Sequence, residues 1–372
     1  MPKNHKYIFL LESIIILLFF SGCLKNNTNE LTEEILQNIS NQYKVNCPIV
    51  SAESVLDIKK IELPKEIKNL KISCYGILDS DNLLINLYEE NGAITSIKEL
   101  GKYGINDQSY TTIFEYMDNY VYDICAYNNE YLIIKIGDNE WWSHADLYLY
   151  NINLKSLKLI FNYSTDSNGE LYYFPFNNNI LIKDNVVYFD DFWKDKDQIR
   201  ASLYQYDINT DTVVKIVDDA QNPLPLGDEI IYFSKKNNSY KYIESISGKF
   251  SCNIESFIHD IDTNKNQIFS IDIIENDEIK HETLFGIYTW NNDKCILETI
   301  YPIDKLNADD NFVTFTNNYE AIPIIYDINN DRVIAFDELY GISNWFFDGD
   351  YRILHLTNNS VNTLYMFSLK ES

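Results

Sequence analysis

The sequence has few residues of several types, and each shortage excludes a class of protein. Basic residues are scarce: 30 Lys and Arg stand against 56 Asp and Glu, so the formal net charge is −26. This charge argues against binding to nucleic acid or to an anionic lipid surface, because both are themselves negative. Only one long apolar run occurs, at the N-terminus, which excludes a polytopic membrane protein. Hydrophobic residues make up 45% of the chain, too many for an intrinsically disordered protein.

Motifs that carry common chemistries are also missing. The sequence has no GxSxG, HExxH or GxGxxG segment and no P-loop. Its five His are dispersed, no CxxC pair exists, and no Cys/His spacing matches a zinc site. We therefore expect no metal and no cofactor, and we identify no catalytic residue. Paired acids for glycoside hydrolysis stay open, because 56 acidic residues make chance pairs unavoidable.

The N-terminal residues have the pattern of an export signal. A short basic segment at residues 3–6 precedes an apolar stretch at 7–20, which is too short for a confident membrane-spanning helix. The segment Phe20-Ser21-Gly22-Cys23 follows, and it resembles the lipobox of bacterial lipoproteins. That resemblance implies that residues 1–22 are a signal peptide and that Cys23 is diacylated and becomes the mature N-terminus.

Two departures accompany this resemblance. Phe20 stands where the family usually has Leu, and Glu12 places a charge in the apolar stretch. An ordinary cleaved signal and an uncleaved anchor therefore stay open. Under the lipoprotein interpretation the protein is lipid-anchored at the extracytoplasmic face of the cell membrane, and residues 23–54 form the lipidated Cys, a polar tether and a short helix. We expect that helix from Thr32 to Ile39, with Thr32 as its cap.

Five cysteines remain besides Cys23: Cys47, Cys74, Cys125, Cys252 and Cys295. An odd number cannot all pair within one chain. Cys74 and Cys125 lie in strand-like runs, where we expect buried small hydrophobic side chains. One disulfide stays open, because an extracytoplasmic domain meets an oxidising environment.

From about Val55 onward the sequence reads as short strands separated by Asn, Asp, Gly and Ser turns. The clearest unit runs from Val121 to Phe161 and contains four strands, which is the size of one propeller blade. A Tyr-Asp-Ile-Asn-like corner recurs at residues 150–153, 206–209 and 326–329. We expect Asp and Asn to form these corners, and Asn to replace Gly, because their side chains bond to nearby backbone.

Counting expected third strands gives the blade number. They lie near Tyr88, Tyr150, Tyr206, Ile243, Tyr288, Tyr326 and Tyr365, which predicts seven four-stranded blades over residues 55–372. The last unit, Ser343 to Leu369, has only three strands, so we expect Leu56 to Leu63 to supply its outer strand and close the ring. Six or eight blades, and a β-sandwich or two smaller β domains, are the alternatives to this all-β, seven-bladed propeller.

This pattern resembles bacterial lipoproteins with a TolB-like or WD40-like β-propeller of uncharacterised function. The resemblance covers roughly Val55 to Ser372 and rests on the strand pattern. The WD dipeptide and Gly-His signature of WD40 repeats and the Gly-Gly pair of kelch repeats are absent. The family therefore implies a fold and a location rather than an activity.

Two constellations are candidate sites. Oxygen-bearing side chains alternate from Asp260 to Asn266, as in a calcium loop, but Lys265 and Ile271 occupy the positions of the expected Gly and Glu, so we favour a plain hairpin turn.

Aromatic residues form the second constellation. Trp141, Trp142, Phe192 and Trp193 fall in the expected second-to-third-strand loops of two adjacent blades, among acidic residues. Such aromatics suit sugar stacking or a protein hot spot. The alternative is that they fill gaps between blades, as we expect for Trp290 and Trp345.

The preferred hypothesis is therefore a membrane-anchored propeller whose loop face binds a protein or glycan partner. The partners expected are the membrane, through the N-terminal lipid, and an unknown protein or glycan, but no nucleic acid. Two alternatives stay open. One is an envelope glycan hydrolase or lyase with acids at the central channel, and the other is a passive scaffold in an envelope complex.

Overall fold

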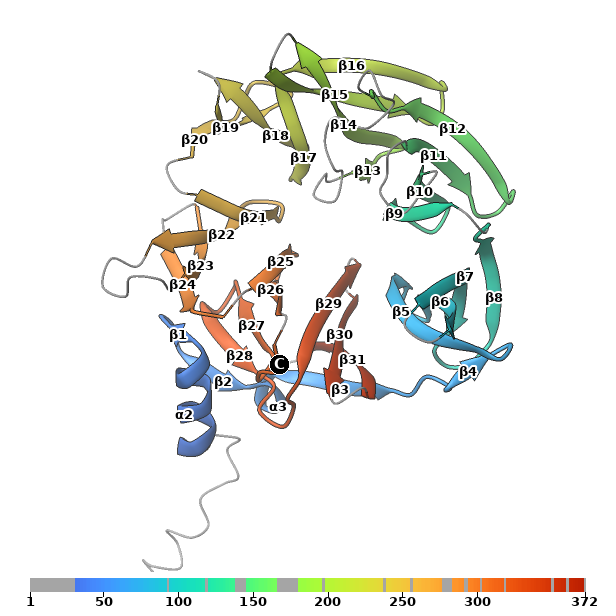
Figure 1. The fold of residues 1–372 in the computed structure, drawn as a ribbon. Coiled ribbons are helices and arrows are strands. Elements are labelled where there is room, and N and C mark those ends of the chain that lie inside the picture. Colours follow the sequence, from blue (N-terminus) through green and yellow to red (C-terminus); the bar gives the residue numbers. More distant parts are fainter. Residues whose placement is uncertain are drawn as a thin grey trace, which may run out of the picture.

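Seven β-sheets stand around a common centre and form a seven-bladed β-propeller (Figure 1). The structure is a computed structural model. It describes residues 31–370 apart from 92–93, 118–119, 138–144, 166–179, 196–197, 237–238, 255–256, 276–282, 291–293, 302, 318, 349–350 and 359–360. The all-β class and the blade number predicted from the sequence are confirmed.

Each blade is built from consecutive antiparallel strands, the first nearest the centre of the ring. Blade 1 consists of β5 (Leu70–Asp79), β6 (Asn82–Asn91), β7 (Ile94–Gly104) and β8 (Tyr110–Glu115), and blade 2 consists of β9 (Val121–Tyr127), β10 (Tyr131–Gly137), β11 (Ala145–Asn151) and β12 (Ser156–Asn162). Blade 3 consists of β13 (Leu181–Lys183), β14 (Val186–Asp195), β15 (Gln198–Asp207) and β16 (Thr212–Asp218), and blade 4 consists of β17 (Ala220–Leu226), β18 (Glu229–Lys236), β19 (Ser239–Ser245) and β20 (Ser251–Asn253). A two-residue strand, β4 (Glu66–Ile67), pairs with the start of β5.

Blades 5 to 7 take an extra strand each from the N-terminal region. In blade 5 the consecutive strands are β21 (Phe257–Thr263), β22 (Ile268–Glu275), β23 (Thr283–Thr289) and β24 (Lys294–Thr299). In blade 6 they are β25 (Ile303–Ala308), β26 (Phe312–Asn317), β27 (Ile324–Asp327) and β28 (Arg332–Ala335). In blade 7 they are β29 (Ile342–Asp348), β30 (Tyr351–Asn358) and β31 (Val361–Leu369).

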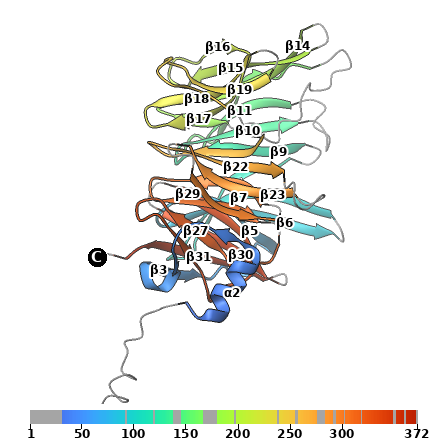
Figure 2. The same ribbon diagram turned by 90° about the vertical axis from the view of Figure 1, so that its left-hand side faces the viewer.

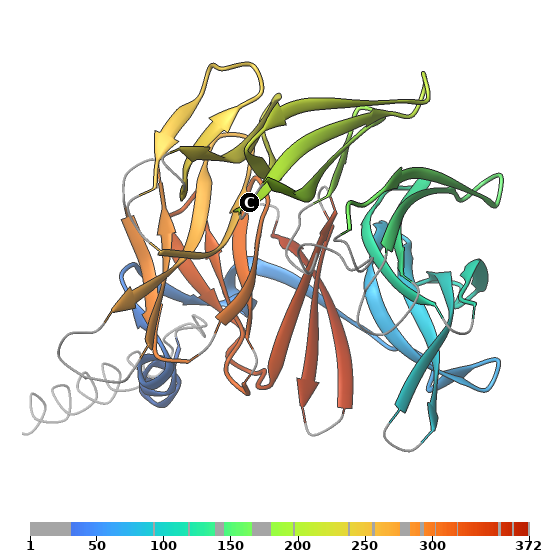
Figure 3. The same cartoon turned by 45° about the horizontal axis from the view of Figure 1, so that its top comes forward.

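The N-terminal region runs along the outside of these three blades (Figure 1, Figure 3). It consists of α2 (Glu33–Gln42), β1 (Lys44–Val45), β2 (Ile49–Ser51), α3 (Ala52–Val55) and β3 (Leu56–Ile61), and we call residues 33–61 the strap. β1 pairs with β24, β2 pairs in parallel with β28, and β3 pairs with β31. The predicted closing strand is thereby confirmed, and the sheets also take in residues that precede Val55.

Helix α2 forms for the reasons that its sequence indicates. Thr32 caps it, with its Oγ1 accepting a hydrogen bond from the Ile35 N–H at 3.3 Å, and two Glu in the first turn favour the positive end of the helix dipole. Ile39 is fully buried in the apolar cluster between blades 5 and 6. The Gln42 carbonyl accepts a hydrogen bond from Thr299 Oγ1 at 2.8 Å, so the helix is packed on the ring and is not a free spacer.

The recurring corners form as predicted, with one difference. Asp207 Oδ1 accepts hydrogen bonds from the N–H groups of Asn209 and Thr210, at 2.8 and 3.1 Å. The left-handed residue that follows is Lys155, Asp211 or Asp331, with φ of 50°, 57° and 50°. Lys and Asp, rather than Asn, therefore occupy these three positive-φ positions, and the side chain at the start of the corner stabilises the turn.

One expected third strand is assigned wrongly. Tyr88 lies on β6, the second strand of blade 1, because β7 and β8 both follow it in the sheet. The other six expected residues lie on third strands, Tyr150 on β11 and Tyr365 on β31 among them. The error arises because the Leu-Tyr-Glu-Glu-Asn-Gly segment ends a long second strand and is not a corner between third and fourth strands.

Candidate functional site

The aromatic constellation predicted from the sequence is only partly within the described residues. Trp141 and Trp142 belong to the segment 138–144, which lies outside them, so their role stays a prediction. Phe192 and Trp193 lie on strand β14 itself and not in a loop, because the β14–β15 ladder continues to the last residue of β14. They therefore sit in the arm of a long hairpin, which extends at one face of the ring (Figure 2).

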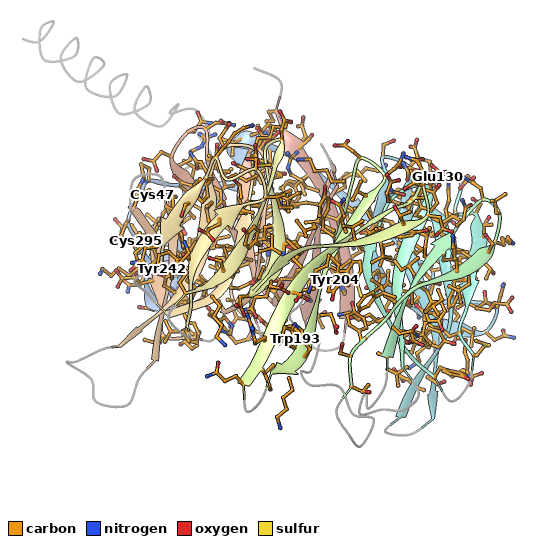
Figure 4. The ribbon with its side chains drawn as sticks, turned by 90° about the horizontal axis from the view of Figure 1, so that it is seen from above. Cys47, Glu130, Trp193, Tyr204, Tyr242 and Cys295 are labelled. Atoms are coloured by element: carbon orange, nitrogen blue, oxygen red, sulfur yellow. The ribbon has the colours of Figure 1, made fainter. Side chains whose placement is uncertain are left out.

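Trp193 is half-buried and held by its own blade (Figure 4). Its Nε1–H donates to Ser202 Oγ at 3.0 Å, and that hydroxyl donates to Asp218 at 2.8 Å. The Arg200 guanidinium lies 5.2 Å from the centre of a Trp193 ring, while its Nε donates to Asp219 Oδ1 at 2.7 Å. These contacts favour a packing role for Trp193. Trp345 is likewise buried, as expected, and Trp290 is half-buried against the core of blade 4.

A partly exposed group of four tyrosines and one methionine lies instead where blade 1 connects to blade 2. We call Tyr116, Met117, Tyr120, Tyr122 and Tyr148 the aromatic surface. Met117 is 56% exposed and Tyr120 is 51% exposed. Tyr122 anchors them: its ring packs edge-on against Tyr116 at 4.9 Å and lies 6.5 Å from Tyr120, and its hydroxyl accepts a hydrogen bond from the Met117 N–H at 3.1 Å.

The described residues on either side of the segment 138–144 lie near this surface. Val121, which follows Tyr120, pairs with Gly137, and Gly137 pairs with Ala145. Both ends of the segment 138–144 therefore lie beside the start of β9. Tyr148 of β11 packs against the same apolar cluster as Tyr116 and Tyr122.

The sequence analysis missed these residues although the chain carries a signal for them. Aromatic side chains recur at Phe114, Tyr116, Tyr120 and Tyr122, on both sides of the turn between two expected blades. The exposed members lie on the connection itself, where a strand pattern makes no prediction.

Buried carboxylates form a second polar feature. Asp190 and Asp191 on β14 are 1% and 3% exposed. Asp190 accepts the Asn222 N–H at 2.7 Å, and Asp191 accepts the backbone N–H and the hydroxyl of Ser164 at 3.0 and 2.6 Å. Burial raises the pKa of Asp190 to about 6, against the lowering effects of the Asn222 N–H and of Lys135, itself 1% exposed.

Asp260 and Asp262 likewise accept backbone N–H groups across a blade boundary, that between blades 5 and 6. Their Oδ2 atoms accept the backbone N–H groups of Leu306 and Ala308, at 2.6 and 2.7 Å, on the inner strand of the next blade. Burial raises the pKa of Asp262 to about 7. Asn264 caps the following turn by accepting the N–H groups of two residues, so the calcium-like spacing forms a hairpin, as favoured from the sequence.

Metal-ligand groups, membrane-spanning helices and disulfides are absent from the part of the chain that the structure describes. No group of three or more His, Cys, Asp and Glu residues is placed to hold a metal ion there. Within the same residues no helix has the length and apolarity needed to cross a membrane. All five cysteines from Cys47 to Cys295 are free thiols. Burial raises the pKa of Cys74 and of Cys125 to about 12, as expected for apolar packing.

Comparison with known proteins finds likenesses in structure and none in sequence. The sequence matches no established family and no curated protein. The structure is similar to the β-propeller domain of the trilobed protease from Pyrococcus furiosus, with 11% identity, a TM-score of 0.47, and coverage of 80% of this chain and 96% of that one. It is also similar to an uncharacterised protein from Listeria monocytogenes EGD-e, with 12% identity, a TM-score of 0.49, and coverage of 88% and 98%. An oligogalacturonate lyase in complex with manganese matches at 7% identity and a TM-score of 0.44, over 85% and 97% of the two chains. These likenesses concern the propeller fold alone.

Proposed function

We propose that this protein is a lipid-anchored binding protein of the cell envelope. In this proposal Cys23 carries the acyl chains at the extracytoplasmic face of the membrane, and the propeller binds a protein or glycan partner through the aromatic surface. The observation that carries the binding part is the exposure of Met117 and Tyr120 above the packed Tyr122.

Tyrosine side chains are well suited to binding a ligand. Tyr offers a large flat apolar face with a polar tip and only two rotatable bonds, so little entropy is lost when it meets a ligand. Tyr122 and Tyr116 pack against the buried Phe114, at 5.6 and 5.4 Å between ring centres, which holds the base of the surface rigid. A rigid base with the exposed Tyr120 ring and Met117 side chain above it suits sugar stacking or a protein hot spot.

The buried acids do not favour the enzyme alternative. A general acid with a raised pKa must reach the substrate. The Asp190 side chain is covered, and Asp262 has one oxygen on the Ala308 N–H and the other on the Thr263 N–H at 2.8 Å. These carboxylates join neighbouring blades, and a structural role accounts for their positions.

The anchoring part rests on the lipobox-like segment and on the position of the strap. The cap of α2, Thr32, lies nine positions after Cys23, and an extended chain of that length spans about 30 Å. The ring would therefore stay close to the membrane. The surface charge of −26 gives no attraction to anionic lipid, so stable attachment would depend on the acyl chains.

Labelling tests the anchor. The full chain is produced in a bacterium that is fed an alkyne analogue of palmitate. We expect the label to be lost in Cys23→Ala and kept in Cys47→Ala. Equal labelling of Cys23→Ala would overturn the anchoring claim.

Titration tests the binding surface. The probes are soluble oligomers of N-acetylglucosamine and of glucose, together with the arginine peptide described below. Tyr120→Ala should weaken binding of one probe class at least tenfold. Tyr340→Ala, which removes a Tyr that is 46% exposed on another blade connection, should leave it unchanged. Equal affinities for the two variants would reject the aromatic surface as the site.

A further inference from the structure

We propose that the partner is a protein that lays an arginine side chain over Tyr120 and Tyr122 of the aromatic surface, with Asp146 accepting hydrogen bonds from the same guanidinium. This inference rests on the proposed function, because it names the group that the aromatic surface binds and selects a protein over a glycan.

The first observation is an arrangement that this protein uses inside its own fold. On blade 3 the Arg200 guanidinium lies 5.2 Å from the centre of a Trp193 ring and donates to Asp219. The Arg200 and Asp219 side chains are each 29% exposed, so the arrangement forms at a partly open surface. Arginine suits it because one flat guanidinium can lie over a ring and present a fork of N–H donors to a carboxylate.

The same arrangement recurs where blade 7 meets blade 6. The Arg352 guanidinium lies 4.9 Å from the centre of the Phe312 ring, and its Nε donates to Asp309. Here the three groups come from two blades and the Arg352 side chain is only 5% exposed. An aromatic ring with a nearby aspartate is thus a setting in which this fold twice places an arginine.

The second observation is that the aromatic surface offers the rings of this arrangement without its cation. The ring centres of Tyr120 and Tyr122 lie 6.5 Å apart. One cation can therefore lie within about 6 Å of both centres, the range of cation–π attraction. Among the described residues no basic side chain lies over a ring of the aromatic surface. Tyr120 is 51% exposed, so a partner can reach it.

The third observation is that an aspartate shares a sheet face with these rings. Tyr122 of β9 pairs with Ile136 of β10, and Ile136 pairs with Asp146 of β11. Residues opposite one another in a sheet point to the same face, and two strand spacings amount to about 10 Å. One guanidinium above Ile136 would therefore lie between the Tyr122 ring and the Asp146 carboxylate.

Asp146 is also oriented by its own blade. Its Oδ1 accepts a hydrogen bond from Asn162 Nδ2 of β12 at 2.7 Å. A carboxylate can accept about four hydrogen bonds, so this bond positions Asp146 without using all of its acceptor sites. Bidentate pairing with arginine is the stronger kind of charge-assisted bond.

The surrounding charges favour a cationic guest. The formal net charge of −26 attracts cations at long range. Lys98 of blade 1, whose carbonyl accepts the Tyr116 N–H at 2.9 Å, forms an ion pair with Glu89 at 3.9 Å. The positive charge of Lys98 is thereby balanced within its own sheet.

The aspartate selects between the two ligand classes left open above. A neutral sugar stacks on Tyr rings but brings no cation to Asp146. Arginine brings both a flat face and a charge, and it is enriched among the residues that dominate binding at protein interfaces. The arrangement of Tyr120, Tyr122 and Asp146 therefore fits a protein that presents an arginine.

The test uses the whole protein and two peptides of Gly and Ser that differ in one central residue. One peptide carries arginine, and the other carries citrulline, which has the same shape without the charge. Affinities are measured by ligand-observed nuclear magnetic resonance at about 0.15 M salt, where attraction beyond about 8 Å is screened. The variants are Tyr120→Leu, which removes the ring, Tyr120→Phe, which keeps it, and Asp146→Asn. The matched control is Tyr340→Leu, at a Tyr that is 46% exposed elsewhere on the ring, and circular dichroism checks folding.

We expect the arginine peptide to bind at least fivefold more tightly than the citrulline peptide. This preference should persist in Tyr120→Phe and Tyr340→Leu, disappear in Tyr120→Leu, and fall at least twofold in Asp146→Asn. Asp146→Asn decides the question by itself if Tyr120→Leu is not folded.

Equal binding of the two peptides to the native chain would overturn the inference. An arginine preference that Tyr120→Leu and Asp146→Asn both retain would mean attraction to the overall charge and would also overturn it. Glycan binding that is lost in Tyr120→Ala, without any preference for arginine, would overturn this inference and leave the proposed function standing.

Discussion

The outer edges of blades 5 to 7 and the outer edge of blade 2 differ in what covers them. The first three are paired with strap strands, and the strap buries Ile39, Leu56 and Ile61 against the ring. Strand β12 carries no such cover among the described residues, and its leucines are exposed. The same kind of outer strand is therefore covered in one region and uncovered, with exposed leucines, in the other.

Truncation of one leucine in each region should give the largest difference in stability between the covered and the uncovered edge. Leu56→Ala removes a side chain that is 2% exposed, and we expect it to lower the free energy of unfolding by about 2–5 kcal/mol. Leu157→Ala, at 39% exposure, should lower it by less than about 1 kcal/mol. Urea unfolding measures both. Similar losses would show that the edge of blade 2 is part of the stability of the ring.

The pH dependence should be alike at two blade boundaries, that of Asp190 between blades 3 and 4 and that of Asp262 between blades 5 and 6. The folded-state pKa values of Asp190 and Asp262, about 6 and 7, lie above the unfolded value of about 3.9. The folded protein therefore binds these protons more tightly, and its stability should fall as the pH rises from about 4 through 7. Charged groups nearby are Lys135 and Asp191 for Asp190, and Asp260 and Lys305 for Asp262.

Urea unfolding at pH 5 and pH 8 checks this direction. Asp262→Asn removes one titration while its amide oxygen can still accept a backbone N–H, so the difference between the two pH values should shrink. Carboxyls with lowered pKa values, such as Asp331, act in the opposite sense but below about pH 4. A native protein more stable at pH 8 than at pH 5 would contradict the prediction.

Trp193 lies on blade 3, whose outer edge, like that of blade 2, carries no strap strand among the described residues. If it packs its hairpin, Trp193→Phe should cost about 1 kcal/mol, because the ring stays and the hydrogen bond to Ser202 is lost. Thermal unfolding of this variant is the measurement. Full stability combined with loss of a bound probe would instead favour a ligand-binding role for Trp193.

The smallest effect concerns the ion pair at the open edge. Lys158→Met should change the free energy of unfolding by less than about 1 kcal/mol, because both partners are largely exposed. It should, however, make the edge more apolar and leave Asp211 without this lysine. Sedimentation compares self-association of this variant with that of Lys215→Met on β16, and equal behaviour would argue against a special role for β12.

The sequence predicted the ring better than the site, and the reason is periodicity. Alternation repeats from blade to blade and Asp/Asn corners recur in three of them, so the strands of 121–161 and the closing strand at Leu56 could be located. The position of Tyr88 was misread because a long second strand also ends in polar residues. The aromatic surface could not be located because exposure of Tyr120 depends on how two blades meet, which no local pattern contains.

Pairing of Leu56 with Leu369 joins opposite ends of the chain, and this has a consequence for the order of folding. The strap is synthesised before blade 1, whereas its partners in blades 5 to 7 are synthesised after blade 4. Contacts so distant in sequence make closure a late and slow event. Until then β24, β28 and β31 have bare edges, so folding intermediates should be more prone to aggregate than the finished ring.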